Sequence, residues 1–146
     1  MSSSDAPHAT DPTQAPAGPS PTVWPTLRCR DARALIAFLG AAFGFVENVV
    51  YGDGEVVEHA QLDWPEGGGV MLGSDRPGTS WARQPGTGAS YVVTAHPDAV
   101  HDRAVAAGAE IVKGLSDQDY GSRDFIARDP EGNLWSFGTY PGAPPG

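Results

Sequence analysis

The sequence is poor in cysteine and in long apolar runs, and both shortages exclude classes of protein. Cys29 is the only cysteine among the 146 residues, which excludes an intrachain disulfide and a cluster of thiolate metal ligands. We therefore expect a cytoplasmic protein. No run approaches the roughly 20 apolar residues that a membrane-spanning helix needs, so we expect no membrane partner.

Basic residues are also scarce. Nine Lys and Arg stand against 18 Asp and Glu, which gives a net charge of −9. Nucleic-acid binding requires Lys and Arg opposite the phosphates, so this balance argues against a nucleic-acid partner. A negative surface attracts positively charged ligands and thus favours a cationic small molecule, although the same acidity also serves solubility alone.

The two ends of the chain have little that builds a core. Residues 1–22 contain five prolines and no Val, Ile, Leu or aromatic residue, so we predict a disordered tail there. This tail has neither an apolar run nor a basic flank, and it therefore lacks the pattern of a signal peptide. We expect one compact domain over residues 23–140 and a second disordered end over 141–146.

What the sequence does contain is an internal repeat. Asp129-Pro-Glu-Gly-Asn133 has the pattern of a tight turn, and an aromatic strand-like run follows it up to Tyr140. The same Pro-Glu-Gly occurs at residues 65–67, and a glycine follows six residues after each turn glycine, at Gly73 and Gly138. Four identities at constant spacing indicate an internal duplication.

Each half of the chain has the pattern of a strand, a helix and three further strands. In the first half these are residues 27–31, 32–42, 45–51, 56–63 and 70–72. In the second half, at a shift of about 64 residues, they are 91–94, 97–107, 110–112, 124–128 and 134–139. We predict an α+β fold in which two βαβββ modules, residues 23–75 and 88–140, form an eight-stranded curved sheet around a cavity, with helices outside.

These features together resemble a known family. The duplicated βαβββ pattern, Arg30-Asp31 before the first helix and Asp129-Pro-Glu-Gly-Asn133 are similar to the glyoxalase/bleomycin-resistance/extradiol-dioxygenase superfamily, also called vicinal oxygen chelate proteins. The likeness covers essentially all of residues 23–140. It implies paired βαβββ modules, often assembled as homodimers, with the ligand in the sheet-lined cavity.

Metal-dependent members of that family hold a divalent ion on His, Glu or Gln at equivalent strand positions. Carried onto this sequence, these positions are Trp24, Met71, Ser136 and one residue within 88–90. Indole, thioether and hydroxyl groups do not replace imidazole and carboxylate as ligands of such an ion. We therefore expect no metal, no other cofactor and no catalytic residue.

Strand alternation indicates which side chains face the cavity. Two further candidates, Trp81 and Tyr120, come from Gly-rich loops expected to cap it. The candidate ligand-binding residues are Trp24, Thr26, Arg28, His59, Gln61, Met71, Trp81, Ser90, Val92, Tyr120 and Ser136. This lining favours a small organic ligand that is aromatic or cationic. We predict a metal-independent homodimer of the bleomycin-resistance-like branch that sequesters such a ligand.

Two alternatives stay open at this point. Glu58 and His59 are adjacent and suggest a displaced metal site, as in a glyoxalase- or dioxygenase-type lyase or oxidoreductase. The other alternative is a scaffold with a stress or regulatory role and no small-molecule chemistry, in which Trp24 and Met71 only fill space.

Overall fold

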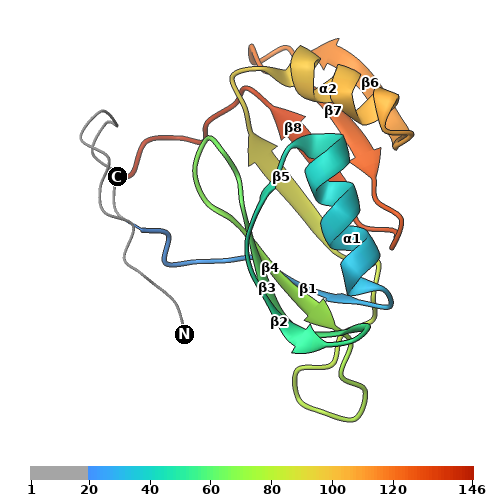
Figure 1. Cartoon of the computed structure of the whole chain (residues 1–146). Coiled ribbons are helices and arrows are strands. Elements are labelled where there is room, and N and C mark those ends of the chain that lie inside the picture. Colours follow the sequence, from blue (N-terminus) through green and yellow to red (C-terminus); the bar gives the residue numbers. More distant parts are fainter. Residues whose placement is uncertain (1–19) are drawn as a thin grey trace, which may run out of the picture.

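The computed structural model describes residues 20–146, which form two βαβββ modules (Figure 1). Module 1 contains β1 (Thr26–Cys29), α1 (Ala32–Phe38), the π-helical turn η1 (Leu39–Phe43), β2 (Val46–Asp53), β3 (Val56–Asp63) and β4 (Gly69–Ser74). Module 2 contains β5 (Ala89–Val93), α2 (Pro97–Ala106), β6 (Glu110–Asp117), β7 (Arg123–Arg128) and β8 (Leu134–Gly138). The predicted α+β fold of two βαβββ modules is confirmed. Of the disordered tail predicted over residues 1–22, residues 1–19 lie outside the described residues.

The eight strands form two four-stranded sheets. Sheet A has the order β1-β4-β3-β2, and sheet B has the equivalent order β5-β8-β7-β6. In both sheets the first strand runs parallel to the last strand, and the other neighbours are antiparallel. The identical order in both sheets is what the internal repeat predicts.

The first helix begins and ends at the residues that the sequence indicates. The Asp31 side chain accepts a hydrogen bond from the Ala34 backbone N at 3.1 Å, which is the ordinary action of an N-cap. Gly44 ends the helical segment with a positive φ of 94°, a conformation that glycine adopts without steric cost.

One hydrophobic core serves both modules and lies between the helices and one face of each sheet. Phe43, at the end of η1, packs against Trp135 and Phe137 of β8, with ring centroids 5.8 and 4.6 Å apart. An aromatic side chain of module 1 therefore fills the core of module 2. Since a module of this size buries too little apolar surface to be stable alone, the two fold as one unit.

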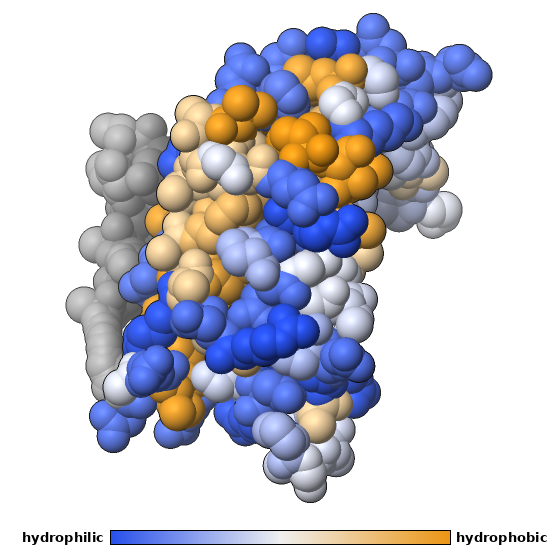
Figure 2. All heavy atoms as spheres, turned by 90° about the vertical axis from the view of Figure 1, so that its right-hand side faces the viewer, coloured by the Kyte–Doolittle hydropathy of each residue, from blue (hydrophilic) through white to orange (hydrophobic). Residues whose placement is uncertain are grey.

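No helix within residues 20–146 covers the second face of either sheet. In Figure 1, α1 lies in front of the region where the two sheets meet, and α2 covers the far end of sheet B. The side of the molecule seen in Figure 2 is largely hydrophilic, and its hydrophobic side chains gather mainly in the upper half. Within residues 20–146, no helix combines the length and the apolar composition that a bilayer crossing requires.

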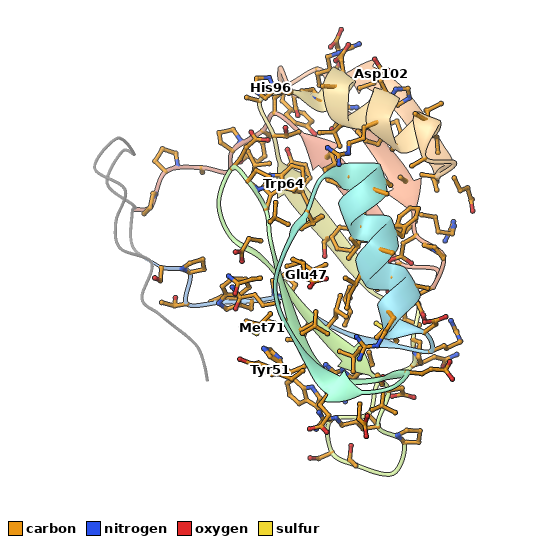
Figure 3. All side chains as sticks on the ribbon, in the orientation of Figure 1. Glu47, Tyr51, Trp64, Met71, His96 and Asp102 are labelled. Atoms are coloured by element: carbon orange, nitrogen blue, oxygen red, sulfur yellow. The ribbon has the colours of Figure 1, made fainter. Side chains whose placement is uncertain are left out.

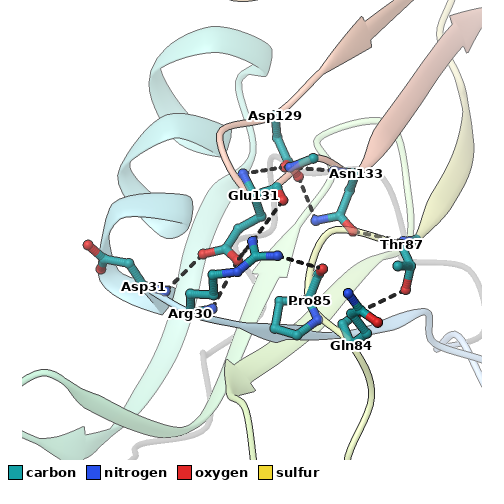
Figure 4. A network of polar contacts seen from close by, with 10 residues as sticks. Arg30, Asp31, Gln84, Pro85, Thr87, Asp129, Glu131 and Asn133 are labelled. Atoms are coloured by element: carbon teal, nitrogen blue, oxygen red, sulfur yellow. Dashed lines mark hydrogen bonds and ion pairs between the residues drawn. The ribbon is translucent and has the colours of Figure 1, made fainter.

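The Asp129 carboxylate organises the turn before β8 (Figure 4). It is buried, and its Oδ1 accepts hydrogen bonds from the backbone N atoms of Glu131, Gly132 and Asn133 at 2.9, 2.9 and 3.0 Å. Its Oδ2 accepts from Asn133 Nδ2 and from the Trp135 indole N, both at 2.9 Å. One carboxylate thus satisfies five donors, which fixes the turn and the orientation of a core tryptophan.

The Glu131 carboxylate reaches from this turn into module 1 (Figure 4). Its Oε1 accepts from the Arg30 backbone N at 2.9 Å, and its Oε2 accepts from the Asp31 backbone N at 2.8 Å. These donors lie directly before α1, where backbone N–H groups have no partner within the helix. The Arg30 guanidinium also donates to the backbone oxygens of Glu131 and Pro85.

Glu66 makes the equivalent contact in the opposite direction. It lies in the first Pro-Glu-Gly turn, and its carboxylate accepts from Ala95 N at 2.8 Å and from Thr94 Oγ1 at 2.6 Å, directly before α2. Each turn of the repeat therefore binds the start of the other module's helix segment. This reciprocal pair of contacts, here called the glutamate clasp, explains why the glutamate recurs 65 residues apart.

We expect Glu131→Ala to lower the free energy of unfolding by about 2 kcal/mol, because it removes a carboxylate that is only 6% exposed and leaves two backbone donors without their acceptor. Glu66→Ala should cost about 1 kcal/mol, because its turn is exposed. The two losses should add, since the sites share no partner. Urea denaturation measures them, with the exposed Glu55→Ala as control. Losses equal to that of the control in both variants would rule out the clasp.

Candidate functional site

The open face of sheet A, on the side away from α1, carries most of the strand residues singled out above. Thr26 pairs with Met71, and Met71 pairs with Gln61, so these three side chains form a row across β1, β4 and β3. Trp24 and Arg28, two residues before and after Thr26, share this face by alternation. Figure 3 shows Met71 and Tyr51 projecting from sheet A on the side opposite α1.

His59 adds an aromatic pair to the open face. It lies opposite Tyr51 in the β2–β3 hairpin, and the two rings stack with centroids 6.2 Å apart and planes 16° apart. Tyr51 is 53% exposed and offers a flat surface to a ligand. The sequence analysis missed Tyr51, because a register shift between Tyr51 and Gly52 places it across from His59, whereas the turn alone would pair it with Glu58.

Gln61 is held in place on the same face. Its side-chain N donates to Asp63 Oδ1 at 2.8 Å, and Asn48 donates to Asp63 Oδ2 at 2.8 Å. The Gln61 amide oxygen is thereby left directed away from Asp63. The open face of sheet A thus combines Trp24, Thr26, Arg28, Tyr51, His59, Gln61 and Met71, a set with both flat apolar groups and polar ones.

The expected orientation of Ser90 and Val92 is wrong. In the register of β5 and β8, Ser90 pairs with Trp135 and Val92 with Phe137, so both point to the core side. Tyr91, which pairs with Ser136, takes the open face of sheet B instead. The first, third and fourth strands of the two modules are offset by 65 residues, whereas the second strands are offset by 64. Using 64 for the first strands reversed every side chain there.

Ser90 and Val92 line a different cavity. It has a volume of about 430 Å³ and lies at the junction of the modules, between β5 and the first Pro-Glu-Gly turn. Trp64 forms part of its wall and donates through its indole N to the Val93 backbone oxygen at 3.0 Å. Ser136 lies apart from this cavity, on the open face of sheet B beside Tyr91 and Ile126.

The two loop candidates occupy separate places. Trp81 lines a pocket of about 280 Å³ together with Thr26 and Arg28, so it caps one end of the sheet A face. Tyr120 lies in the β6–β7 turn of sheet B and packs edge-on against Tyr140, with ring centroids 5.9 Å apart. The structure therefore joins Trp81, but not Tyr120, to the sheet A residues.

Among the described residues, Arg28 is the one buried cation of this face. It is 7% exposed, and its Nη1 donates to the Ser74 backbone oxygen at 3.3 Å. Burial, and to a smaller extent the nearby Arg76, lowers the pKa of Arg28 below its ordinary value. A buried guanidinium that forms no ion pair within residues 20–146 favours a ligand that brings negative charge or hydrogen-bond acceptors.

The residues at the family's metal positions do not fit a divalent ion. With the offset of 65 residues, these positions are Trp24, Met71, Ala89 and Ser136, and none has an imidazole or carboxylate. Within residues 20–146, no three His, Cys, Asp or Glu side chains are grouped so that they could hold a metal. This includes the neighbourhood of Glu58 and His59.

Cys29 is packed in the core beneath the helices rather than exposed as a nucleophile. It is 1% exposed, and burial raises the pKa of its thiol from 9.0 to about 12, with a smaller contribution from Glu131. The thiol is therefore protonated and unreactive at neutral pH.

We expect Cys29 to resist thiol-specific disulfide reagents in the folded protein at pH 8 and to react fully in urea. The raised pKa also has a consequence for stability. Its contribution is fully present below pH 9.0 and is lost as the pH rises towards about 12, because the unfolded chain releases the proton first. Cys29→Ala should lack this component in alkaline denaturation curves. Rapid labelling of the native protein would contradict the burial.

Comparisons with known proteins agree with this architecture. The model of the Glyoxalase/Bleomycin resistance protein/Dioxygenase superfamily matches residues 22–137. An uncharacterized protein of Mycobacterium bovis is 36% identical over 127 residues, which cover 81% of this chain and 82% of the relative.

Two solved structures show the same fold. The structure of TioX from Micromonospora sp. ML1 aligns with a TM-score of 0.68 at 31% identity and covers 77% of this chain and 93% of its own. A glyoxalase/bleomycin resistance protein from Catenulispora acidiphila aligns with a TM-score of 0.60 at 22% identity, over 80% of this chain and 95% of its own. The chain belongs to the Glyoxalase/Bleomycin resistance protein/Dioxygenase superfamily.

Proposed function

We propose that this protein binds a small organic molecule without a metal, in the manner of the sequestering, bleomycin-resistance type of its superfamily. The observation that carries the proposal is the composition of the four metal positions, Trp24, Met71, Ala89 and Ser136. None of these four side chains is a ligand for a divalent ion, and each is suited to contact with an organic molecule. A cytoplasmic location fits the single, buried cysteine.

The ligand that fits the open face of sheet A is flat and aromatic. The Tyr51–His59 stack, Trp24 and Met71 offer planar and polarisable surfaces, and Gln61 offers an oriented amide. The net charge of −9 attracts a ligand that also carries a positive group, and Asp63 supplies a negative charge on this face.

We further propose that two copies associate and enclose the site. Tyr51 on sheet A and Tyr91 and Val93 on sheet B are 53%, 45% and 40% exposed, so the open faces of both sheets offer apolar surface that a second copy would cover. Sedimentation velocity at about 50 µM should give the mass of a dimer. A monomer at that concentration would contradict this part of the proposal.

Tryptophan fluorescence tests the binding itself. The chain, kept in EDTA, is titrated with planar aromatic cations and with glycopeptide antibiotics. We expect saturable quenching by at least one planar compound, and an affinity about tenfold lower in Trp24→Leu or Met71→Ala. The exposed Val105→Ala on α2 serves as the matched control.

Two results would overturn the proposal. Absence of quenching by every compound would leave a scaffold role. Binding that appears only after addition of Zn²⁺, Ni²⁺, Mn²⁺ or Fe²⁺, and that His59→Ala abolishes, would indicate a metal-dependent enzyme.

A further inference from the structure

Arg28 uses only part of its hydrogen-bonding capacity. Its Nη1 donates to the Ser74 backbone oxygen at 3.3 Å, whereas its buried Nε has no partner among residues 20–146. Within this part of the chain, Nη2 donates to no acceptor, and no Asp or Glu forms an ion pair with Arg28. A guanidinium that is 7% exposed and whose buried Nε has no partner within residues 20–146 calls for an acceptor from outside the chain.

The position of the guanidinium is fixed by Gly73. This residue pairs with Arg28 across β1 and β4, and a Cβ at Gly73 would lie 3.0 Å from Arg28 Nη1. The absence of a side chain therefore lets the guanidinium lie against β4 with its Nη1 end held by Ser74. The opposite edge, formed by Nε and Nη2, presents two parallel N–H groups, which is the arrangement that binds a carboxylate through both oxygens.

Arg28 lines the pocket of about 280 Å³ between β1 and the loop that connects the modules. Trp81, 52% exposed, forms one wall, and Arg83, Thr26 and Gln84 supply further polar groups. In a chain with a net charge of −9, the described residues that line this pocket include two arginines and no acidic side chain. The pocket is thus locally positive and has a flat indole at its side.

We propose that this pocket binds the carboxylate of a small planar aromatic acid, with the carboxylate on the Nε–Nη2 edge of Arg28 and the ring against Trp81. The inference rests on the proposed function, because Thr26 and Arg28 belong to the open face of sheet A, where the ligand is proposed to bind. It adds that the end of the ligand next to Trp81 is a carboxylate. The volume lies near the lower limit of ordinary ligand pockets and suits a single ring, or one end of a larger ligand. A bound carboxylate would also reverse the lowering of the Arg28 pKa that burial causes.

Benzoate is the probe, and benzamide is its neutral counterpart of the same shape. Each is titrated into the full-length protein while the fluorescence is followed, with Trp81→Phe identifying the signal of Trp81. We expect saturation by benzoate with a dissociation constant of about 1 mM and binding of benzamide about tenfold weaker. Arg28→Gln should reduce benzoate affinity about tenfold or more, whereas Arg33→Gln should not, because its guanidinium is exposed and bonds the Gly54 backbone oxygen.

A second measurement does not depend on the folding of a variant. The ¹⁵N NMR signal of the Arg28 Nε–H, assigned in the wild-type protein, should shift on addition of benzoate and shift much less on addition of the same concentration of benzamide. Equal affinity for the two compounds, benzoate binding unchanged by Arg28→Gln, or no binding up to about 10 mM would overturn the inference.

Inorganic phosphate separates a carboxylate site from a general anion site. If phosphate binds as tightly as benzoate and with the same dependence on Arg28, the assignment to a planar acid is wrong. Failure of benzoate alone leaves the proposed function standing as long as planar compounds still quench through Trp24. Failure of both sets of compounds overturns the two proposals together.

Discussion

Replacing Asp129 by alanine is expected to lower the free energy of unfolding by about 4 kcal/mol, because three backbone N–H groups, the Asn133 amide and the Trp135 indole lose their acceptor at once. Asp129 is 4% exposed, so water does not replace the lost oxygen atoms. Urea denaturation followed by fluorescence measures the loss. Trp135 also serves as a local reporter, because its indole N–H bonds to Asp129.

Two variants give this experiment its control. Asp129→Asn keeps one acceptor oxygen and should lose about half as much stability as the alanine variant. Asp119→Ala, in the exposed β6–β7 turn, should cost almost nothing. If Asp129→Ala and Asp119→Ala were equally stable, the network seen in Figure 4 would have no energetic role.

The second large effect is a gain of metal binding. We expect the combined variant Trp24→His, Met71→Glu, Ala89→His and Ser136→Glu to bind Ni²⁺ or Zn²⁺ at least about 100-fold more tightly than the wild-type chain. The first pair lies on the open face of sheet A and the second pair on that of sheet B. Four ligands converge only if these two faces meet across one cavity, within a chain or between two copies. Isothermal titration calorimetry measures the affinity.

A half-variant with Trp24→His and Met71→Glu alone is the matched control, and it should bind metal only weakly. A folded four-fold variant that binds no better than this control would show that the two faces do not share a cavity. The proposed enclosure of the ligand between sheets would then be wrong, while the fold would be unaffected.

The sequence was sufficient to predict the duplicated fold, because its signals are local. The Pro-Glu-Gly turns, the N-cap at Asp31 and the glycine that ends the helical segment each act within a few residues. What the sequence did not reveal is the use of the repeated glutamates. Glu66 and Glu131 bind partners about 30 and 100 residues away in the chain, and no local pattern indicates such contacts.

The site was predicted less completely, for two physical reasons. A shift of one residue exchanges the two faces of a strand. An offset of 64 in place of 65 therefore predicted Ser90 and Val92 on the open face of sheet B, where Tyr91 lies instead. The pocket of Arg28 depends on where the long connecting loop folds back, and loops of this length have no repeating pattern from which to place them. Trp81 was identified because an aromatic residue in a Gly-rich loop is itself a signal.

The central claim is that this member of the superfamily binds its ligand without a metal, and metal stoichiometry tests it most directly. Purified wild-type protein is dialysed against Zn²⁺, Ni²⁺, Mn²⁺ or Fe²⁺, and the bound metal is measured by inductively coupled plasma mass spectrometry. Ligand titrations are run in parallel in EDTA. We predict much less than one metal ion per chain and unchanged ligand affinity in EDTA. One tightly bound ion per chain that is lost in His59→Ala, together with ligand binding that requires this ion, would contradict the account.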